Sequence, residues 1–356
     1  MSRIVFLFPG HGASPCGGLK VIGEYANRLA TDGHAVAIVY AGSLFWRRKN
    51  LYFKLTNCVR YLQRLLSGYS CRGWFPLDRR VREFLALSLC QRHVPKADRY
   101  IATNPHTAMY LRDYQVADGR RYYFIQGYEN WGDVDDAALR RTYHYPLRKI
   151  VISRWLKNVM DEEHEPCAVI PNGLDFKRFS LSIPIERKAP FRVAMLFHTM
   201  ARKDCQTGFR ALDMVKQKYP ALRVNLFGVP PRPEHLPEWY DYYRQPDAET
   251  HNRIYNEAAI YLGTSQTEGW GLTVGEAMIC GCAVVCTDNP GYREMAEDGV
   301  NALISPVRDA VGLANNIMRL IEDDELRLRL AHEGHRMIQH FRWEDSYAMF
   351  RRELQL

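Results

Sequence analysis

The sequence has 356 residues, of which 47% are hydrophobic and 25% are charged, and its formal net charge at pH 7 is +8. This composition is that of an ordinary globular protein and excludes intrinsic disorder, while the length favours two domains over one hydrophobic core. No apolar run approaches the roughly 20 residues that a membrane-spanning helix needs. We therefore expect a two-domain protein that is made and kept in the cytoplasm.

The excess positive charge is concentrated in one segment. Residues 41–80 contain nine Lys and Arg side chains and a single Asp, so the rest of the chain is balanced. This distribution argues against nucleic acid as a partner. The nine cysteines are scattered, and the densest group, Cys280, Cys282 and Cys286, has no histidine at ligand spacing. We expect reduced thiols and no bound metal or other cofactor.

The first half of the chain alternates between strand and helix patterns. A buried strand is predicted at 3–8, then a glycine-rich loop, a helix that ends at Gly33, and a second strand at 34–40. Further strands are predicted at 99–103, 121–126 and 148–153. Strands separated by helical stretches pair in parallel through right-handed crossovers. This order predicts a Rossmann-like N-terminal domain over residues 1–185.

Residues 41–80 form a basic, aromatic insert in this domain. Apolar residues recur at helical spacing from 51 to 66, next to basic side chains and to Phe45 and Trp46. Two interpretations stay open. The insert is either an amphipathic surface that rests on anionic lipid, with aromatics at headgroup level, or a core-facing helix with a solvated basic face.

The alternation restarts after a proline-containing linker near 180–190. Strands are predicted at 191–197, 222–228, 261–265, 283–288 and 302–306, and helices at 207–220, 252–260, 272–281 and 308–339. This half predicts a second Rossmann-like domain over residues 186–335, with the remaining 336–356 forming a helix that crosses back to the first domain.

The segment TEGWGLTVGEAM at 267–278 follows a strand and opens a helix. Glu268 precedes the helix and Glu276 is expected about two turns inside it. The glycines between them let a ligand approach the backbone, and the first amides of a helix attract anions. A sugar and a ribose joined by a diphosphate would match this order of carboxylate, amides and carboxylate. A helix cap with a solvated glutamate is the alternative.

These residues resemble glycosyltransferase family 4. EGWGLTVGE is similar to its Glu–seven residues–Glu motif, and similar family patterns appear in VIPNGLDFKRF at 169–179, in the GG-containing segment 17–36 and in FRWEDS at 341–346. The resemblance covers nearly the full chain, except 40–95. It implies the GT-B fold, in which two Rossmann-like domains with parallel sheets face each other across a cleft, and a retaining, metal-independent reaction on a nucleoside diphosphate-sugar donor.

The resemblance also implies roles for single residues. Glu268 would contact the donor sugar, and Glu276 would hold the ribose hydroxyls. Gly271, Leu272 and Thr273 would offer backbone amides or a hydroxyl to the diphosphate. A second set comes from HTMARKD, where Lys203 aligns with the family's phosphate-binding Lys, His198 stands where the family has Arg, and Arg202 is expected to supply the missing charge.

The remaining expected contacts are spread over both domains. Gly17 and Gly18 would bring backbone amides to the donor phosphate or the acceptor, and Gly228 and Gln245 would border the nucleotide base. Three residues are candidates for acceptor or sugar contacts, namely His106, Glu129 and Asn172.

The sequence thus predicts a hexose-type glycosyltransferase acting on a glycan or lipid-linked acceptor in bacterial surface polysaccharide or lipopolysaccharide assembly, with an anionic membrane surface as a further partner. Another GT-B enzyme, such as a nucleotide-sugar epimerase, would need added acid or base residues. A non-catalytic nucleotide-binding module is the third possibility, and it is disfavoured because the chain has no P-loop and no GxGxxG motif after its first strand.

Overall fold

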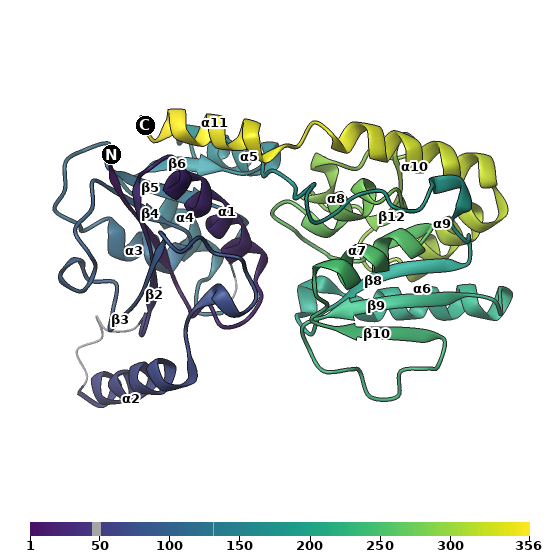
Figure 1. The fold of residues 1–356 in the computed structure, drawn as a ribbon, viewed down its shortest axis with the longest axis horizontal. Coiled ribbons are helices and arrows are strands. Elements are labelled where there is room, and N and C mark those ends of the chain that lie inside the picture. The colour runs from purple at the N-terminus through teal and green to yellow at the C-terminus, as the bar shows by residue number, and fades with distance from the viewer. Residues whose placement is uncertain (45–50, 131) are drawn as a thin grey trace. The chain divides into compact units, whose positions relative to one another are not determined.

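The computed structural model describes residues 1–44, 51–130 and 132–356. The chain folds into two compact units (Figure 1): unit 1 comprises Met1–Pro171 with Ser346–Leu356, and unit 2 comprises Asn172–Asp345. The side chains of Phe45, Trp46 and the basic residues 47–49, on which part of the insert interpretation depends, lie outside the described residues.

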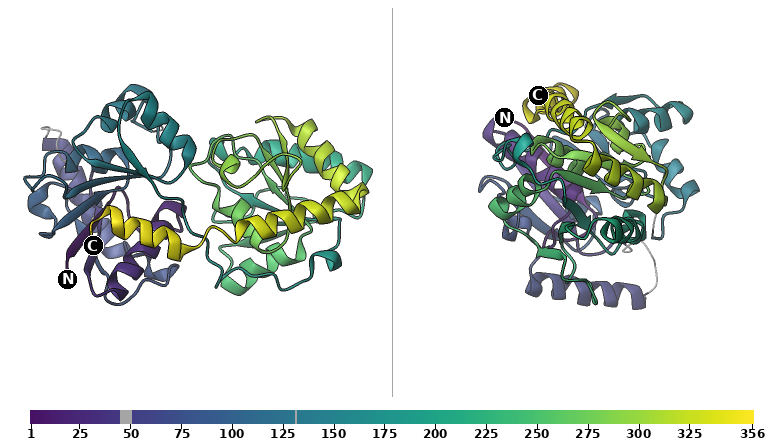
Figure 2. Two further views of the ribbon diagram at one scale, coloured as in Figure 1. Left: turned by 90° about the horizontal axis from the view of Figure 1, so that it is seen from above. Right: turned by 90° about the vertical axis from the view of Figure 1, so that its right-hand side faces the viewer.

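Unit 1 contains a seven-stranded parallel sheet of order β3-β2-β1-β4-β5-β6-β7. Its central strands read as apolar runs because helices cover both faces of the sheet, so side chains on both sides are buried (Figure 2). The strands are β1 Arg3–Phe8, β2 Ala35–Ala41, β3 Arg82–Ala86, β4 Arg99–Ala102, β5 Arg121–Ile125, β6 Arg148–Val151 and β7 Cys167–Val169.

The helices of unit 1 include the last one of the chain. From Ser346 onward α11 belongs to this unit, and Phe350 packs its ring against Tyr25 of α1 at 4.1 Å and against Phe6 and Phe124 from the sheet. This aromatic cluster holds the C-terminal helix on unit 1. The helices are α1 Gly17–Thr31, α2 Leu51–Ser67, α3 Pro105–Leu111, α4 Asp136–Tyr143, α5 Arg154–Glu162 and α11 Trp343–Glu353.

Unit 2 contains a six-stranded parallel sheet of order β10-β9-β8-β11-β12-β13. Aspartates cap three of its helices, since Asp247, Asp309 and Asp323 each accept a hydrogen bond from a first-turn amide. The strands are β8 Arg192–Phe197, β9 Arg223–Gly228, β10 Tyr240–Arg244, β11 Ile260–Gly263, β12 Ala283–Thr287 and β13 Ala302–Ser305. The helices are α6 Cys205–Lys218, α7 Ala248–Glu257, α8 Leu272–Ile279, α9 Ala310–Glu322 and α10 Asp324–Ile338.

The strand orders determine where a ligand can bind in each unit. In unit 1 the chain proceeds from β1 to one side of the sheet and then returns to the other side at β4. In unit 2 the same reversal occurs at β8 and β11. Ligands of open α/β sheets bind beyond the carboxyl ends of the strands at such a switch point. The loops after β1 and β4, and those after β8 and β11, are therefore the places to examine.

Two parallel α/β units confirm the predicted fold class, but the domain boundary lies earlier than residue 186. The segment 180–190 is part of unit 2: Ile185 is in its core, and the buried Lys188 donates hydrogen bonds to the carbonyls of Tyr255, Ala258 and Cys280. Its two prolines suggested a linker, whereas these contacts fasten it to the helix ends it crosses.

Three strands are absent from the sequence prediction. β3 follows the insert, within the stretch 40–95 that the resemblance does not cover. β7 has three residues, and β10, YDYYR, carries polar side chains because it is an edge strand. No helix in the described part of the chain is long and apolar enough to cross a membrane.

Candidate active site

The switch point of unit 2 brings together the cations and the carboxylate that the sequence places far apart. Lys203 ends the short turn after β8, and Glu268 lies in the loop between β11 and α8. Lys203 Nζ donates a hydrogen bond to Glu268 Oε1, and Arg202 Nη1 lies 3.7 Å from Glu268 Oε2. Ser265 Oγ donates to the same carboxylate at 2.7 Å. Ser265 was not predicted, although it lies in the predicted strand 261–265.

These contacts keep Glu268 ionised. Burial acts to raise the pKa of the carboxyl group, but the charge of Lys203, hydrogen bonds from Lys203 and Ser265, and the charge of Arg202 outweigh it, so the pKa of Glu268 lies below its usual value. The Glu268 side chain is 13% exposed and that of Lys203 is 16% exposed. The cations that would meet an incoming anion are thus held by a carboxylate.

His198 follows β8 at the position where the resembled family has Arg. The Nδ1 atom accepts a hydrogen bond from the Met200 amide at 3.0 Å, which leaves the proton on Nε2. Burial, and then the charges of Lys203 and Arg202, lower the pKa of His198. The histidine is therefore a neutral donor near pH 7, and the cationic groups at this edge are those of Lys203 and Arg202.

The N-terminus of α8 faces this same loop. Gly271 caps the helix in a left-handed conformation, with φ of 94°, and provides no side-chain acceptor for the first amides. A Cβ atom at Gly271 would lie 2.6 Å from Cδ1 of Tyr292, so both the conformation and the space require glycine. The amides of Leu272 and Thr273, the first two residues of α8, can consequently turn to an anion.

Glu276 is buried behind this helix end. It is 4% exposed and accepts a hydrogen bond from the Tyr255 hydroxyl of α7 at 3.2 Å. Because α8 begins at Leu272, the residue lies about one turn inside the helix rather than the two turns expected. The order of groups nevertheless follows the prediction: Glu268, then the helix amides, then Glu276.

Gly228 and Gln245 lie on the other side of the switch point, at the ends of β9 and β10. The Gln245 amide donates to the Gly228 carbonyl at 2.8 Å. A Cβ atom at Gly228 would lie 2.2 Å from the carbonyl oxygen of Phe197, so only glycine fits where β8 and β9 end together. All the predicted donor-binding residues of unit 2 are thus at one edge of its sheet, on loops or helix starts that follow β8, β9, β10 and β11.

The predicted residues of unit 1 are also at the carboxyl edge of their sheet. Gly17 and Gly18 are the first residues of α1, and Cys16 before them provides no side-chain cap. The amide group of Gln126, which follows β5, lies 3.4 Å from where a Cβ of Gly18 would be. The first amides of α1 therefore open onto the switch point between β1 and β4.

His106 and Glu129 belong to one hydrogen-bonded network after β4 and β5. His106 Nε2 lies 2.9 Å from Asp133 Oδ1, and Asn104 joins the pair to Glu129 through its Nδ2 donor. Asn104 also caps α3 by accepting from the His106 amide at 2.9 Å. Asp133 was not predicted by itself, although it lies in the loop 127–133 that the sequence singled out.

Asn172 is placed differently from these residues. It is 2% exposed at the start of unit 2, and its Oδ1 is buried without a partner among the described residues. The next residues pair with the returning chain, since the Leu174 amide donates to the Phe341 carbonyl at 2.9 Å. The structure therefore places Asn172 at the first position of unit 2, two residues before Leu174, whose side chain packs beside Gly275 of α8.

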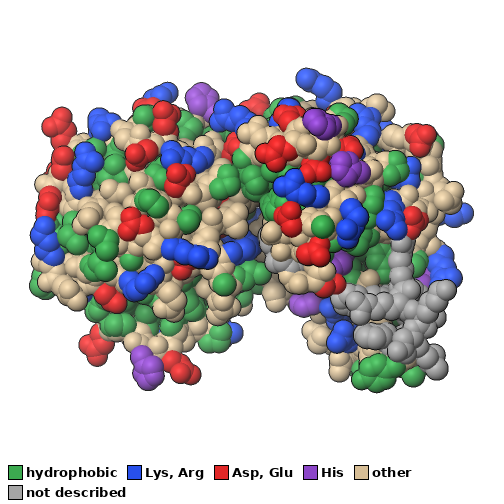
Figure 3. Space-filling view, turned by 180° about the vertical axis from the view of Figure 1, so that it is seen from behind, with side chains coloured by type: hydrophobic (Ala, Val, Ile, Leu, Met, Phe, Trp, Pro, Cys, Tyr) green, Lys and Arg blue, Asp and Glu red, His purple; other side chains and the backbone are tan. Residues whose placement is uncertain are grey.

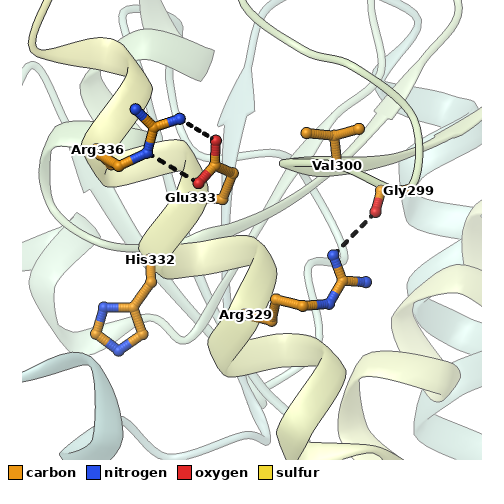
Figure 4. A pocket seen from close by; sticks show the side chains of 6 residues that line it. All are labelled: Gly299, Val300, Arg329, His332, Glu333 and Arg336. Carbon is orange, nitrogen blue, oxygen red and sulfur yellow. Dashed lines mark hydrogen bonds and ion pairs between the residues drawn. The ribbon is translucent and has the colours of Figure 1, made fainter.

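Neither a metal-binding cluster nor the hollow along α10 adds residues to this site. No group of His, Cys, Asp and Glu among the described residues could hold a metal ion, and Cys280, Cys282 and Cys286 are buried free thiols. A hollow of about 460 Å³ lies along α10 (Figure 4), but Arg336 is paired with Glu333 and Arg329 donates to the Gly299 carbonyl. Its cationic groups are already engaged, and none of its lining residues was predicted.

Residues 241–337 match the family described as glycosyl transferases group 1. This range contains β11, α8 and both carboxylates of the candidate site, and all but the first residue of β10. The match covers the part of the chain in which the sequence motif is strongest.

Among curated proteins, the chain is 24% identical over 230 residues to a phosphatidyl-myo-inositol mannosyltransferase of Mycolicibacterium smegmatis, covering 60% of this chain and 59% of that protein. It is 25% identical over 195 residues to a Campylobacter jejuni enzyme named N,N'-diacetylbacillosaminyl-diphospho-undecaprenol alpha-1,3-N-acetylgalactosaminyltransferase, covering 50% and 51%. The aligned regions thus span less than two thirds of these relatives.

Solved structures share the fold over the whole chain. HepE of Anabaena, determined in complex with UDP-glucose, superposes with a TM-score of 0.73 at 17% identity, covering 100% of both chains. The chain thus shares the two-domain GT-B fold of these solved structures, and residues 241–337 match the glycosyl transferases group 1 family.

Proposed function

We propose that the protein is a retaining glycosyltransferase that moves a sugar from a nucleoside diphosphate donor to a glycan or glycolipid acceptor in the assembly of a bacterial surface polysaccharide. The observation that carries this proposal is the cluster at the switch point of unit 2. There Lys203 and Arg202 pair with Glu268 in the loop that leads into α8, and Glu276 is buried one turn inside that helix.

The cluster suits a ligand with two hydroxyl-bearing rings and an anion between them. The α8 amides and the two cations would hold the diphosphate, whose negative charge grows as the sugar leaves. Glu276 would accept hydrogen bonds from the ribose hydroxyls, and Glu268 from the donor sugar. Lys203 then exchanges its hydrogen bond with Glu268 for one to the diphosphate, which frees the carboxylate for the sugar.

The network after β4 and β5 of unit 1 is the proposed acceptor or sugar contact. His106 offers an imidazole oriented by Asp133, and Glu129 offers a carboxylate held by Asn104. Such groups position hydroxyls, and positioning accounts for a large share of the barrier reduction in group transfer. An epimerase would need an acid–base pair beside the donor sugar, whereas the carboxylate of Glu268 is paired with Lys203 and Arg202 and accepts a hydrogen bond from Ser265.

A donor screen tests the proposal. Binding of UDP, GDP and dTDP is measured by calorimetry, and hydrolysis of the corresponding hexose donors is followed by nucleotide release. Wild type should prefer one of the three nucleotides. Glu276→Gln should weaken the binding of that nucleotide, and Glu268→Gln should mainly slow turnover. The matched control is Glu322→Gln, which removes an exposed carboxylate of the same unit. If both site variants used donor as wild type does, the site assignment would be wrong.

We further propose that the protein works at the surface of an anionic membrane, through α2. Five apolar side chains on one face of this helix are more than half exposed: Tyr52, Leu55, Val59, Leu62 and Leu66. The core-facing interpretation is therefore wrong for these residues, since the helix turns them outward. Figure 3 shows the molecule from behind relative to Figure 1, so α2 lies at its lower right. Hydrophobic side chains gather there. Exposed apolar patches of this kind mark interaction surfaces.

Flotation with vesicles of phosphatidylcholine alone or mixed with phosphatidylglycerol tests this second proposal. The double variant Leu62→Glu with Leu66→Glu should lose binding to the anionic vesicles. The control, Val300→Glu with Val311→Glu, places the same charges on exposed valines of unit 2 and should bind as wild type does. Equal binding by the α2 variant would remove the membrane role.

A further inference from the structure

Unit 1 contains a hollow that the proposed donor chemistry does not use. It has a volume of about 300 Å³ and lies between the loop that follows β1 and the C-terminal half of α2. The residues that line it are His11, Ala13, Arg60, Gln63, Arg64, Ser67 and Gly68.

The hollow is positively charged, and no carboxylate is among its described lining residues. Arg64 is held in place because Nη1 donates to the carbonyls of Ala41 and Gly42, where β2 ends. Arg60 is exposed on the next turn of the helix. Burial and the charge of Arg60 lower the pKa of Arg64, and burial and the charge of Arg64 lower the pKa of His11. The two guanidinium groups thus carry like charges close together, and an anion bound between them would relieve their repulsion.

The polar lining and the apolar stripe occupy neighbouring faces of the same helix. The lining residues recur at 60, 63, 64 and 67, and the exposed apolar residues at 52, 55, 59, 62 and 66. With 3.6 residues per turn, the two faces are roughly a third of a turn apart. When the apolar stripe rests in lipid, the hollow stands at the level of the headgroups, where an amphiphile carries its phosphate.

The hollow is also continuous in sequence with the switch point of unit 1. The loop from His11 to Cys16 runs from the end of β1 to Gly17 and Gly18 at the start of α1. The Gly12 amide donates to the carbonyl of Tyr69, which fixes this loop against the chain that follows α2. A group bound in the hollow would thus be next to the loop that leads to the proposed acceptor side.

We propose that this hollow binds the phosphate of a lipid-linked acceptor whose hydrocarbon chain lies along the apolar face of α2. The inference rests on the proposed function and narrows its acceptor from glycans and glycolipids in general to phosphate-linked lipids. Two guanidinium groups with a histidine and a glutamine provide a fork of donors that suits a phosphate or diphosphate. The apolar stripe favours a lipid over a soluble phosphate or a nucleic acid, because neither would cover it.

Vesicle binding by the full-length chain tests the inference. The vesicles are phosphatidylcholine alone, phosphatidylcholine with a long-chain polyprenyl diphosphate, and phosphatidylcholine with phosphatidylglycerol at equal surface charge. The variants are Arg60→Gln and, for a change that keeps both arginines, Gln63→Glu. The control Arg79→Gln alters an exposed arginine of the same unit and changes the net charge as Arg60→Gln does.

Wild type should prefer the polyprenyl diphosphate vesicles to the phosphatidylglycerol vesicles. Arg60→Gln and Gln63→Glu should weaken binding to the former at least about tenfold, the size expected for losing a charge-assisted hydrogen bond, and Arg79→Gln should weaken it less than twofold. Equal losses for all three variants, or equal losses on both anionic vesicles, would show a general charge effect and overturn the inference. Competition by soluble inorganic diphosphate as strong as that by the lipid would overturn the assignment to a lipid.

Nucleotide binding by wild type separates this inference from the proposed function. If wild type binds no nucleoside diphosphate, the proposed function fails and the inference fails with it. If wild type binds a nucleotide but Arg60→Gln and Gln63→Glu bind the lipid diphosphate as wild type does, only the phosphate site is wrong.

Discussion

Replacing Lys203 with methionine tests the candidate donor site most directly. The side chain is mostly buried, so methionine fills similar space while one positive charge is removed. A bound diphosphate loses a charge-assisted hydrogen bond, which is about 1.5–3 kcal/mol. The carboxylate of Glu268 also stays beside the ligand, balanced only by Arg202 at 3.7 Å and by neutral donors. The Kd of the preferred nucleoside diphosphate should therefore rise at least about tenfold.

Removing the charge of Glu268 instead of that of Lys203 should have the opposite effect on nucleotide affinity. In Glu268→Gln, Lys203 no longer pairs with a carboxylate, so it is free to meet the diphosphate without first breaking an ion pair. Affinity for the free nucleotide should stay the same or increase, while turnover of the sugar donor falls. This pair of results separates a phosphate-binding role of Lys203 from a purely structural one, which would weaken binding in both variants.

Isothermal titration calorimetry at one ionic strength provides the measurement. Lys218→Met is the matched control, because Lys218 forms an exposed ion pair with Glu322 on the same unit and should contribute little to stability and nothing to binding. Thermal unfolding of each variant checks that the fold is intact. If Lys203→Met is folded and binds the nucleotide with the wild-type Kd, the diphosphate is not bound at this switch point.

Three further predictions concern stability. The pKa of Glu268 is lowered in the folded chain, so the stabilisation it provides is present above the usual glutamate pKa of about 4.3 and is lost as the pH falls through the lower folded value. Urea unfolding should show a steeper acid loss in wild type than in Glu268→Gln, and parallel curves would contradict this. Lys188→Met removes the amine that donates to three buried carbonyls, two of which also accept from the Cys282 thiol, and should cost about 1–3 kcal/mol of unfolding free energy; a loss below about 1 kcal/mol would mean that water replaces the amine. Gly271→Ala should destabilise unit 2 by about 1–3 kcal/mol, because alanine is strained at φ of 94° and meets Tyr292, and an unchanged melting temperature would contradict that geometry.

The periodicity of the sequence was sufficient to predict two parallel α/β domains, because strands covered on both faces read as short apolar runs. It also predicted that a helix begins after Gly271, since this depends on residues close together in the chain. The polar edge strand β10 has no such run, and the connection at 180–190 is recognisable as part of unit 2 only from the partners of Ile185 and Lys188.

The tertiary structure alone decided which distant residues meet. Lys203 and Glu268 are 65 residues apart in the chain, and they pair because β8 and β11 are adjacent at the point where the strand order reverses. The direction in which α2 faces was open for the same reason: its periodicity specifies an apolar face but not what covers it. In the folded chain that face is turned outward, because the contacts of α2 with unit 1 are made by its other side, through Asn57 and Arg64.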